Sequence, residues 1–272
     1  MGTYETSMYV DQNDLFYVLD KTKQEIKTFS LANKTLLRNI SANITDALSI
    51  VSNLNGDIYV GFQSANFPVL RWRLGSGQPS NVENSTQACY TLFLDDNDGL
   101  YCSLKNDHQV IRIDLNRTSN VADRVAGTGS AGSLNGELNH PHGIFVHTNR
   151  RLYVADCTNN RIQSFDYGNQ TGTTMIGNTT GQFIYSLDCP SAVILDANEI
   201  MYVVDTNHHR ILGIFNNSVK CLAACSGSGS NSSQLKYPHF MYFDRMGNMI
   251  VLDKDNHRVQ QFNLKCNSEY FC

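Results

Sequence analysis

Short runs of β-branched and aromatic residues alternate with polar turns along most of the chain. Residues 140–166 (HPHGIFVHTNRRLYVADCTNNRIQSFD) show the pattern most clearly, because the runs GIFVH, RLYVAD and RIQSF are separated by TNR and CTNN. Apolar runs of four to six residues that end at Asn, Asp or Gly are typical of strands in an antiparallel meander. We therefore expect this stretch to form three consecutive strands.

The same pattern occurs six times in the chain, counting residues 140–166. Each copy can be aligned on an anchor residue, which lies ten positions before the start of the second apolar run. The anchor residues are Thr6, Leu48, Tyr90, His142, Ser191 and His239. They are 42, 42, 52, 49 and 48 residues apart. Strand repeats of about 40 to 50 residues predict propeller blades, because one small sheet cannot bury its faces alone.

The last three copies also share two charged positions. Each ends its second run with an aspartate and begins its third run five residues later with an arginine. The pairs are Asp156 and Arg161, Asp205 and Arg210, and Asp253 and Arg258. Aspartate at such a position accepts hydrogen bonds from the backbone N–H groups of the turn, and arginine pairs with carboxylates. The same pair in several blades is what a structural role predicts, so we do not assign these residues to catalysis.

Three segments of the chain resemble a known repeat. YVADCTNNRIQSF, YVVDTNHHRILGIF and IVLDKDNHRVQQF are similar to the D-x-x-x-[NH]-R core of NHL repeats, and HPHGIFV and YPHFMYF resemble the P-x-G-[IV]-x-[VF] sequence that begins the same repeat. The resemblance is strong over residues 137–263 and weaker over 6–126. It implies an all-β fold, a single six-bladed β-propeller domain over residues 1–272 with four-stranded antiparallel blades. The expected blades are 6–40, 47–86, 89–127, 141–177, 190–224 and 238–272.

Composition narrows the functions to consider. The net charge is −4 and no stretch of 18 apolar residues exists, which argues against a nucleic-acid partner and a transmembrane segment. Residues 1–10 lack the basic flank and apolar core of a signal peptide. Eight cysteines and nine N-x-[ST] sequons nevertheless indicate an extracellular or ectodomain location. We therefore expect a fragment of a longer secreted or ectodomain protein.

The meander places sequons and cysteines at defined positions. If the strands of each blade are named A to D from the inside outward, four sequons fall at C–D turns: Asn33, Asn116, Asn169 and Asn216. Glycans at these turns would cover one face and leave the other for a partner. We predict disulfides between Cys157 and Cys189, which lie on the same face, and between Cys89 and Cys102, which flank one hairpin. The pairing of Cys221, Cys225, Cys266 and Cys272 stays open, with 221–225 and 266–272 preferred.

The B–C loops and the D–A connectors of such a ring lie on one face, which we call the mouth face. Anchor residues begin strand A, so they should line the central mouth, where closed β folds commonly bind ligands. The predicted ligand-binding residues are Tyr90, His142, Ser191 and His239, and Leu48 and Thr6 should complete the ring. Asn160, His209 and His257 should form a rim on the B–C loops. We expect His142 to face solvent, and the uneven polarity of the ring favours an amphipathic ligand.

Two histidines among the anchors raise the question of zinc. If the site held a metal, His142 and His239 would be the ligands, but catalytic zinc usually has three protein ligands and Leu48 occupies the third equivalent position. Peptidyl-hydroxyglycine amidating lyase, which has similar repeats, holds zinc with three histidines and uses an arginine and a tyrosine just after blade aspartates. Cys157, Thr206 and Lys254 stand at those positions here. No cofactor is therefore expected, and a lyase-like zinc enzyme is the alternative to our preferred function. That preferred function is non-enzymatic binding of a protein, peptide or glycan.

Overall fold

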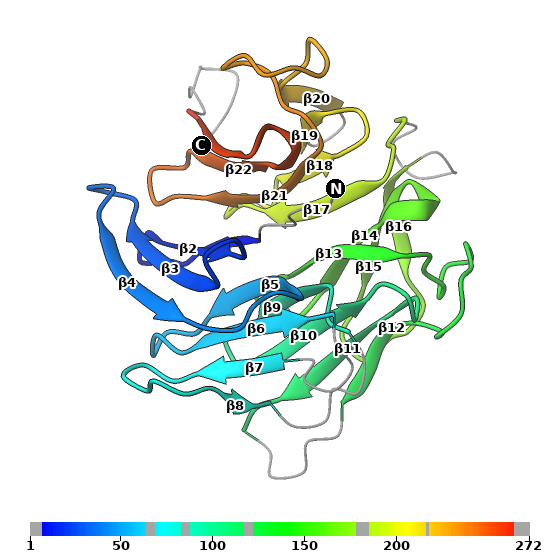
Figure 1. Ribbon diagram of the computed structural model, residues 1–272. Helices are drawn as coiled ribbons and strands as arrows, with labels where there is room; N and C mark the ends of the chain where they lie inside the picture. Colours follow the sequence, from blue (N-terminus) through cyan, green and yellow to red (C-terminus); the bar gives the residue numbers. More distant parts are fainter. Residues whose placement is uncertain are drawn as a thin grey trace.

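The structure is a computed structural model that describes residues 7–63, 69–82, 88–116, 122–177, 185–215 and 218–263. Its strands form six antiparallel sheets, and each sheet uses one continuous stretch of chain. Figure 1 shows that the sheets are arranged in a ring. The prediction of an all-β, six-bladed propeller is confirmed.

The strands of the first three blades run outward in chain order. Blade one contains β1 (Met8–Val10), β2 (Leu15–Asp20), β3 (Glu25–Ser30) and β4 (Leu36–Ser41). Blade two contains β5 (Ala47–Ser52), β6 (Ile58–Phe62), β7 (Val69–Trp72) and β8 (Ser80–Asn81). Blade three contains β9 (Thr91–Leu94), β10 (Gly99–Leu104), β11 (Gln109–Asp114) and β12 (Asp123–Gly127).

The last three blades follow the same order. Blade four contains β13 (Pro141–Val146), β14 (Leu152–Asp156), β15 (Arg161–Phe165) and β16 (Thr173–Gly177). Blade five contains β17 (Pro190–Leu195), β18 (Met201–Asp205), β19 (Arg210–Phe215) and β20 (Ser218–Ala223). Within the described residues, blade six contains β21 (Pro238–Phe243), β22 (Met249–Asp253) and β23 (Arg258–Phe262).

The turns between strands A and B share one arrangement of side-chain-to-backbone hydrogen bonds. The Oδ1 atom of Asp11 accepts hydrogen bonds from the backbone N–H groups of Asn13 and Leu15 at 2.8 and 2.9 Å. Equivalent bonds form at Asn53, Asp95, Asp196 and Asp244. A side-chain acceptor that bonds its own turn favours a tight reversal, which explains why Asp and Asn follow the first apolar run of most copies.

The hydrophobic core lies between neighbouring blades. Trp72 in blade two is 1% exposed and belongs to the same cluster as Tyr17 and Ile26 of blade one. Each further cluster likewise joins side chains of adjacent sheets. Stacking the sheets buries the faces that a single blade would leave in water, and each large apolar side chain so buried contributes about 1.5–3 kcal/mol.

The ring closes where blade six meets blade one. Innermost strands β1 and β21 are in contact, and apolar side chains of both blades form one cluster. The backbone N–H of Arg245 donates to Oδ1 of Asp14 at 2.8 Å, and its Nε donates to the carbonyl of Gln12 at 2.7 Å. Side-chain packing and hydrogen bonds therefore hold this seam.

The structure settles several smaller expectations. Disulfides join Cys89 to Cys102 and Cys157 to Cys189, with Cα atoms 5.4 and 4.0 Å apart, and Cys221 to Cys225 at 5.7 Å. The predicted pair of Cys266 and Cys272 lies outside the described residues. The Gly-, Ser- and Asn-rich composition of residues 74–86 predicts a loop, yet β8 lies within them. Its two exposed polar residues pair with β7 through the backbone, which a hydrophobicity pattern does not register.

Candidate functional site

Most anchor residues lie in β-bulges at the start of strand A. The pairing of β13 with β14 shifts between Pro141 and Ile144, and His142 lies inside this shift. Leu48, Ser191 and His239 lie in equivalent register shifts in the first strands of blades two, five and six. A bulge bends its strand and changes the direction of a side chain. The repeated bulge therefore explains how residues from separate blades meet near the axis.

Tyr90, His142 and His239 form one cluster across the ring. The Tyr90 hydroxyl and Nε2 of His239 are joined by a hydrogen bond of 3.0 Å. The centroid of the Tyr90 ring is 4.7 Å from that of His142, and the two imidazole centroids are 6.0 Å apart. These side chains come from blades three, four and six, so the structure brings together three of the four predicted mouth residues.

Ser191 joins the cluster through the backbone of the next blade. Its hydroxyl donates to the carbonyl of His239 at 2.8 Å, and the hydroxyl of Thr206 donates to Oγ of Ser191 at 2.6 Å. Ser191 is 1% exposed. Its hydroxyl thus links blades five and six.

The expectation that His142 faces solvent is wrong. Its side chain is buried, with 7% of the residue exposed, because the Tyr90 ring packs against it. Among the described residues, neither ring nitrogen of His142 has a hydrogen-bond partner. Burial, followed by the nearby imidazole of His239, lowers the pKa of His142 well below its usual value. A buried, neutral imidazole therefore lies at the centre of the mouth face.

Two of the three predicted rim residues, Asn160 and His209, bond to the connector of the following blade. Asn160 Oδ1 accepts the backbone N–H of Cys189 at 2.8 Å, and Nδ1 of His209 accepts that of Tyr237 at 3.1 Å. His108 in blade three makes the equivalent bond to His140 at 3.1 Å. Asn160, His209 and His257 all have positive φ angles, which explains why Asn and His recur at this position. The acceptors of Asn160 and His209 thus hold neighbouring blades together, and their role toward a ligand stays a prediction.

The repeated aspartates and arginines hold the connectors of their own blades. Asp156 is fully buried, and its Oδ2 accepts from Nε of Arg161 at 2.7 Å. Its Oδ1 accepts the backbone N–H of Asn139, in the connector, at 2.7 Å. Arg161 also donates to connector carbonyls. The same arrangement occurs at Asp205–Arg210 and Asp253–Arg258. The structural role is confirmed, although the bonded N–H belongs to the connector and not to the B–C loop.

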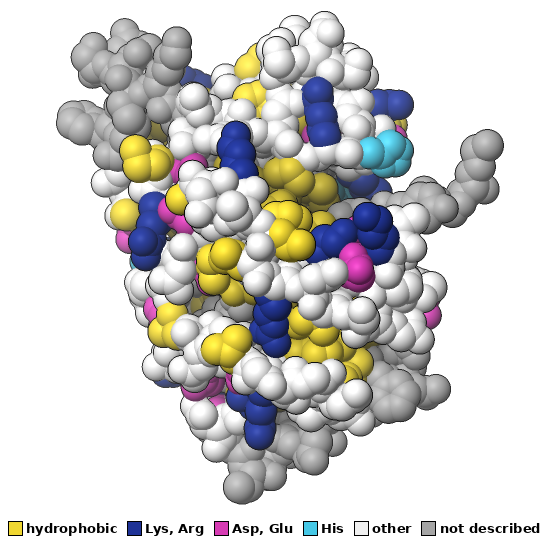
Figure 2. Space-filling view, turned by 60° about the vertical axis from the view of Figure 1, so that its left-hand side comes forward, with side chains coloured by type: hydrophobic (Ala, Val, Ile, Leu, Met, Phe, Trp, Pro, Cys, Tyr) yellow, Lys and Arg dark blue, Asp and Glu magenta, His cyan; other side chains and the backbone are white. Residues whose placement is uncertain are grey.

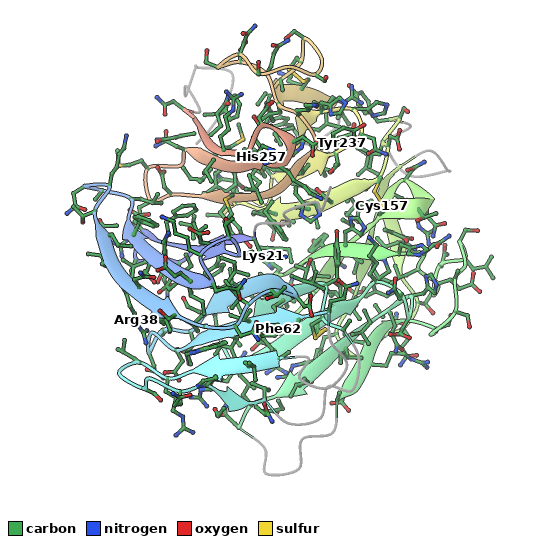
Figure 3. The ribbon with its side chains drawn as sticks, in the orientation of Figure 1. Lys21, Arg38, Phe62, Cys157, Tyr237 and His257 are labelled. Carbon is green, nitrogen blue, oxygen red and sulfur yellow. A yellow bond between two sulfur atoms is a disulfide. The ribbon has the colours of Figure 1, made fainter. Side chains whose placement is uncertain are left out.

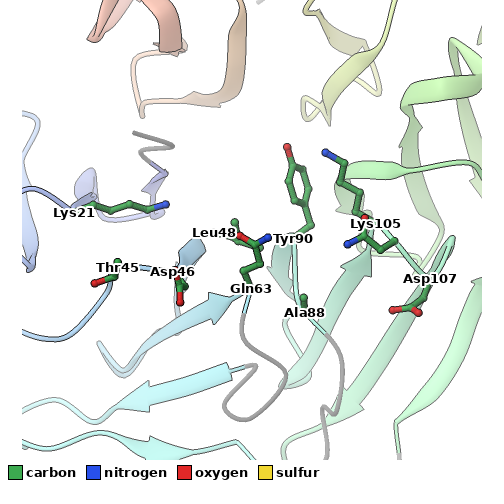
Figure 4. Close-up of a pocket in the computed structure, with 10 residues that line it drawn as sticks. Lys21, Thr45, Asp46, Leu48, Gln63, Ala88, Tyr90, Lys105 and Asp107 are labelled. Carbon is green, nitrogen blue, oxygen red and sulfur yellow. The ribbon is translucent and has the colours of Figure 1, made fainter. Parts of the chain in front are cut away.

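Blades one to three enclose a cavity of about 470 Å³ on the mouth face, which we call the blade 1–3 pocket. Its lining residues are Lys21, Thr45, Asp46, Leu48, Gln63, Ala88, Tyr90, Lys105, Asn106 and Asp107. Figure 4 shows Lys105 beside the Tyr90 ring and Lys21 on the other side of the pocket. The Nζ atom of Lys105 lies 4.6 Å from the centroid of that ring. In Figure 3, Lys21 lies near the centre of the ring, whereas Arg38 lies toward its outer edge.

Of the residues that line this pocket, the sequence predicted only Leu48 and Tyr90 as residues of the mouth. A usable signal was present, because the pocket occupies the part of the ring where the repeat is broken. Phe62 and Leu104 replace the aspartate that ends strand B in blades four to six. The residues that follow them, Gln63 and Lys105, both line the pocket. A departure from the repeat therefore marks the pocket.

The donor atoms on the mouth face do not match a three-histidine zinc site. His142 and His239 supply two imidazoles, and the third member of their cluster is the Tyr90 phenol. Among the described residues, the group of three that could approach one ion is His142 with Cys157 and Cys189. The two sulfurs are joined in a disulfide and are not thiolates. Thr206, at one position expected for a lyase catalytic residue, is buried in the hydrogen bonds of blades five and six.

The opposite face carries the turns with predicted glycosylation sites. Asn33, Asn116 and Asn169 lie after β3, β11 and β15, at exposed C–D turns. Asn216 lies outside the described residues.

Figure 2 shows a side of the molecule on which hydrophobic side chains form separate groups with Lys and Arg among them. In the described part of the chain, no helix has the length and apolarity needed to cross a membrane.

Comparison with known proteins identifies the repeat. The NHL repeat matches residues 138–165 and 235–262. No curated protein sequence matches the chain. Both NHL matches contain an Asp–Arg pair described above.

Solved structures share the fold at low sequence identity. An auxiliary nutrient binding protein from Bacteroides ovatus ATCC 8483 is 18% identical with a TM-score of 0.72, over 94% of this chain and 68% of that one. Virginiamycin B lyase from Staphylococcus aureus is 14% identical with a TM-score of 0.60, over 98% and 86%. A chain of the nidogen/laminin complex is 16% identical with a TM-score of 0.61, over 89% and 91%. These neighbours include both binding proteins and an enzyme.

Proposed function

This chain is a six-bladed β-propeller that contains NHL repeats, and we propose that it is a non-enzymatic extracellular binding module. The observation that carries the proposal is the blade 1–3 pocket, a polar cavity of about 470 Å³ on the mouth face. Cavities of this size are typical of ligand sites. The pocket lies where the repeat departs from its structural pattern, which is where a function added to a repeated scaffold is expected.

The groups in the pocket favour a peptide segment of a partner protein. Lys21 and Lys105 bring ammonium groups, and Asp46 and Asp107 bring carboxylates, so the lining carries both signs of charge. Peptides offer charges of both signs together with backbone hydrogen-bonding groups, whereas neutral glycans offer hydroxyl and acetamido groups without charge. Tyr90 adds an aromatic surface, and aromatic residues are enriched in protein interfaces.

Features outside the pocket are consistent with this proposal. Three disulfides suit an oxidising, extracellular environment. Glycans at Asn33, Asn116 and Asn169 would occupy the opposite face and leave the mouth face accessible. Structural neighbours include proteins described as nutrient-binding and one solved in a complex with laminin or nidogen. The two-imidazole donor set on the mouth face does not favour the zinc lyase alternative.

Screening immobilised protein against a peptide library and a glycan array tests the proposal. We expect peptides that contain an acidic residue to be captured, and the double variant Lys21→Ala/Lys105→Ala to lose this capture. Arg151→Ala, which changes an exposed arginine paired with Asp166 away from the pocket, is the control and should retain it. Thermal unfolding should show that both variants are folded. Capture of glycans alone, or capture lost in Arg151→Ala and kept in the double variant, would contradict the proposal.

A further inference from the structure

A second cavity lies within the channel, and its walls follow the repeat. Each anchor residue is followed three positions later by an apolar or aromatic residue on the innermost strand of its blade. These residues are Tyr9, Val51, Phe93, Phe145, Ile194 and Tyr242. All six line a cavity of about 250 Å³. One residue from every blade therefore contributes to a closed ring, which we call the channel ring.

The channel cavity is separate from the mouth. Three residues of a β-strand span about 10 Å, so the channel ring lies about 10 Å along the strands from the anchor residues. The lining extends to Val10, Leu94 and Phe243, which end the first strands of blades one, three and six. Those strand ends adjoin the A–B turns on the opposite face. Of the residues that the structure describes, none lines both the channel cavity and the blade 1–3 pocket.

None of the described residues that line the channel cavity carries a charged side chain. Phe93 and Phe145 make an edge-to-face contact with ring centroids 5.5 Å apart, and Tyr9 and Tyr242 make another at 5.4 Å. These contacts join blades three and four and blades one and six. They fix aromatic rings at two places in the wall, where a planar apolar molecule could pack against ring faces or edges.

Hydroxyl groups give the cavity a limited polar character. Thr91 is 5% exposed and lines the cavity, and its Oγ1 has no hydrogen-bond partner among the described residues. Burial raises the pKa of Tyr9 and Tyr242 above the usual value for a phenol, so both keep their O–H donors at neutral pH. A buried hydroxyl without a partner is costly, and a ligand with one hydrogen-bonding group would relieve that cost.

We propose that the channel cavity binds an uncharged aromatic molecule that carries one hydroxyl or carbonyl group. The size of the ligand follows from the volume. An apolar cavity of about 150 Å³ holds benzene, so in proportion a cavity of about 250 Å³ suits roughly ten non-hydrogen atoms, the size of two fused rings. An ionised group would lose its hydration without an opposite charge in the wall, so anions and cations of the same shape are excluded.

Two probes with the same fused ring system and different charge test this site. At pH 7, 2-naphthol is neutral and 2-naphthoate is an anion, and binding of each can be followed by isothermal titration calorimetry. We expect 2-naphthol to bind at least about tenfold more tightly. Ile194→Phe fills the channel ring and should weaken 2-naphthol binding about tenfold or more. Thr91→Val keeps the side-chain volume, removes the hydroxyl, and should weaken it roughly threefold.

Lys105→Ala, which changes the blade 1–3 pocket, should leave 2-naphthol binding unchanged and separates this proposal from the proposed partner site. If Ile194→Phe does not fold, Thr91→Val and nuclear Overhauser contacts from naphthol protons to the Phe145 and Tyr242 rings still decide the question. Equal affinity for the two probes, no measurable binding of 2-naphthol, or binding that Lys105→Ala weakens and the channel variants do not, would overturn the proposal.

Discussion

Blades four to six and blades one to three share one architecture but use the end of strand B differently. In blades four to six, a fully buried aspartate ends strand B and pairs with an arginine that begins strand C. In blades two and three, Phe62 and Leu104 take the place of the aspartate. Blade one keeps Asp20 but pairs it with Lys27 at 2.6 Å, and both side chains are partly exposed.

The residue that directly follows strand B also has a different role in the two halves of the ring. In blades four and five, Cys157 forms a disulfide and the Thr206 hydroxyl is buried in hydrogen bonds between blades. In blades one to three, the equivalent Lys21, Gln63 and Lys105 all line the blade 1–3 pocket. The regular half of the ring uses its loop residues to hold connectors, and the irregular half presents the same positions to a cavity. Departures from the repeat therefore locate this cavity better than the repeat itself does.

Removing the buried aspartate should have the largest effect on stability. Asp156→Ala leaves the guanidinium of Arg161 buried without its carboxylate and removes the acceptor for the Asn139 N–H. We expect the free energy of unfolding to fall by about 3–5 kcal/mol. The matched change in the irregular half, Asp20→Ala, removes a partly exposed pair and should cost less than about 1 kcal/mol.

Chemical denaturation of both variants with intact disulfides gives these values directly. Equal losses for Asp156→Ala and Asp20→Ala would show that the two halves of the ring do not differ in the way described.

A smaller effect concerns the contact between the halves, where His142 of blade four packs against Tyr90 of blade three. Burial and the adjacent His239 lower the pKa of His142, so the unfolded chain takes up a proton at about pH 6.5 that the folded chain does not. The free energy of unfolding therefore decreases as the pH falls from 6.5 toward the lower pKa that His142 has in the folded chain. Between pH 7 and 5.5 this loss should be about 1 kcal/mol.

His142→Phe keeps a ring without the titrating group and should remove this part of the pH dependence. His140 and His209, whose pKa values burial also lowers, remain in both proteins and cancel in the comparison. An unchanged pH dependence of the unfolding free energy in His142→Phe would contradict the account of the buried imidazole.

The fold could be predicted because every blade needs apolar strands, and the apolar runs that form them therefore repeat along the sequence. The anchor residues were also predictable, since the offset from strand B fixes their position. The burial of His142 was not predictable, because it depends on packing against Tyr90, which also bonds to His239, and these residues are far apart in the chain. The pocket was missed for a related reason: Lys21, Gln63 and Lys105 form no local motif in the sequence, and they are related only by occupying the same position of the repeat in three neighbouring blades.

The central claim is that position within the ring, and not residue type, determines which loop residues contact the partner. Lys105 and Lys254 test it, because both follow the last residue of strand B, in blades three and six, and only Lys105 lines the blade 1–3 pocket. The measurement is the Kd of a captured peptide for the variants Lys105→Ala and Lys254→Ala. The account predicts a loss of roughly tenfold for Lys105→Ala and less than about twofold for Lys254→Ala. Equal losses, or a larger loss for Lys254→Ala, would contradict it.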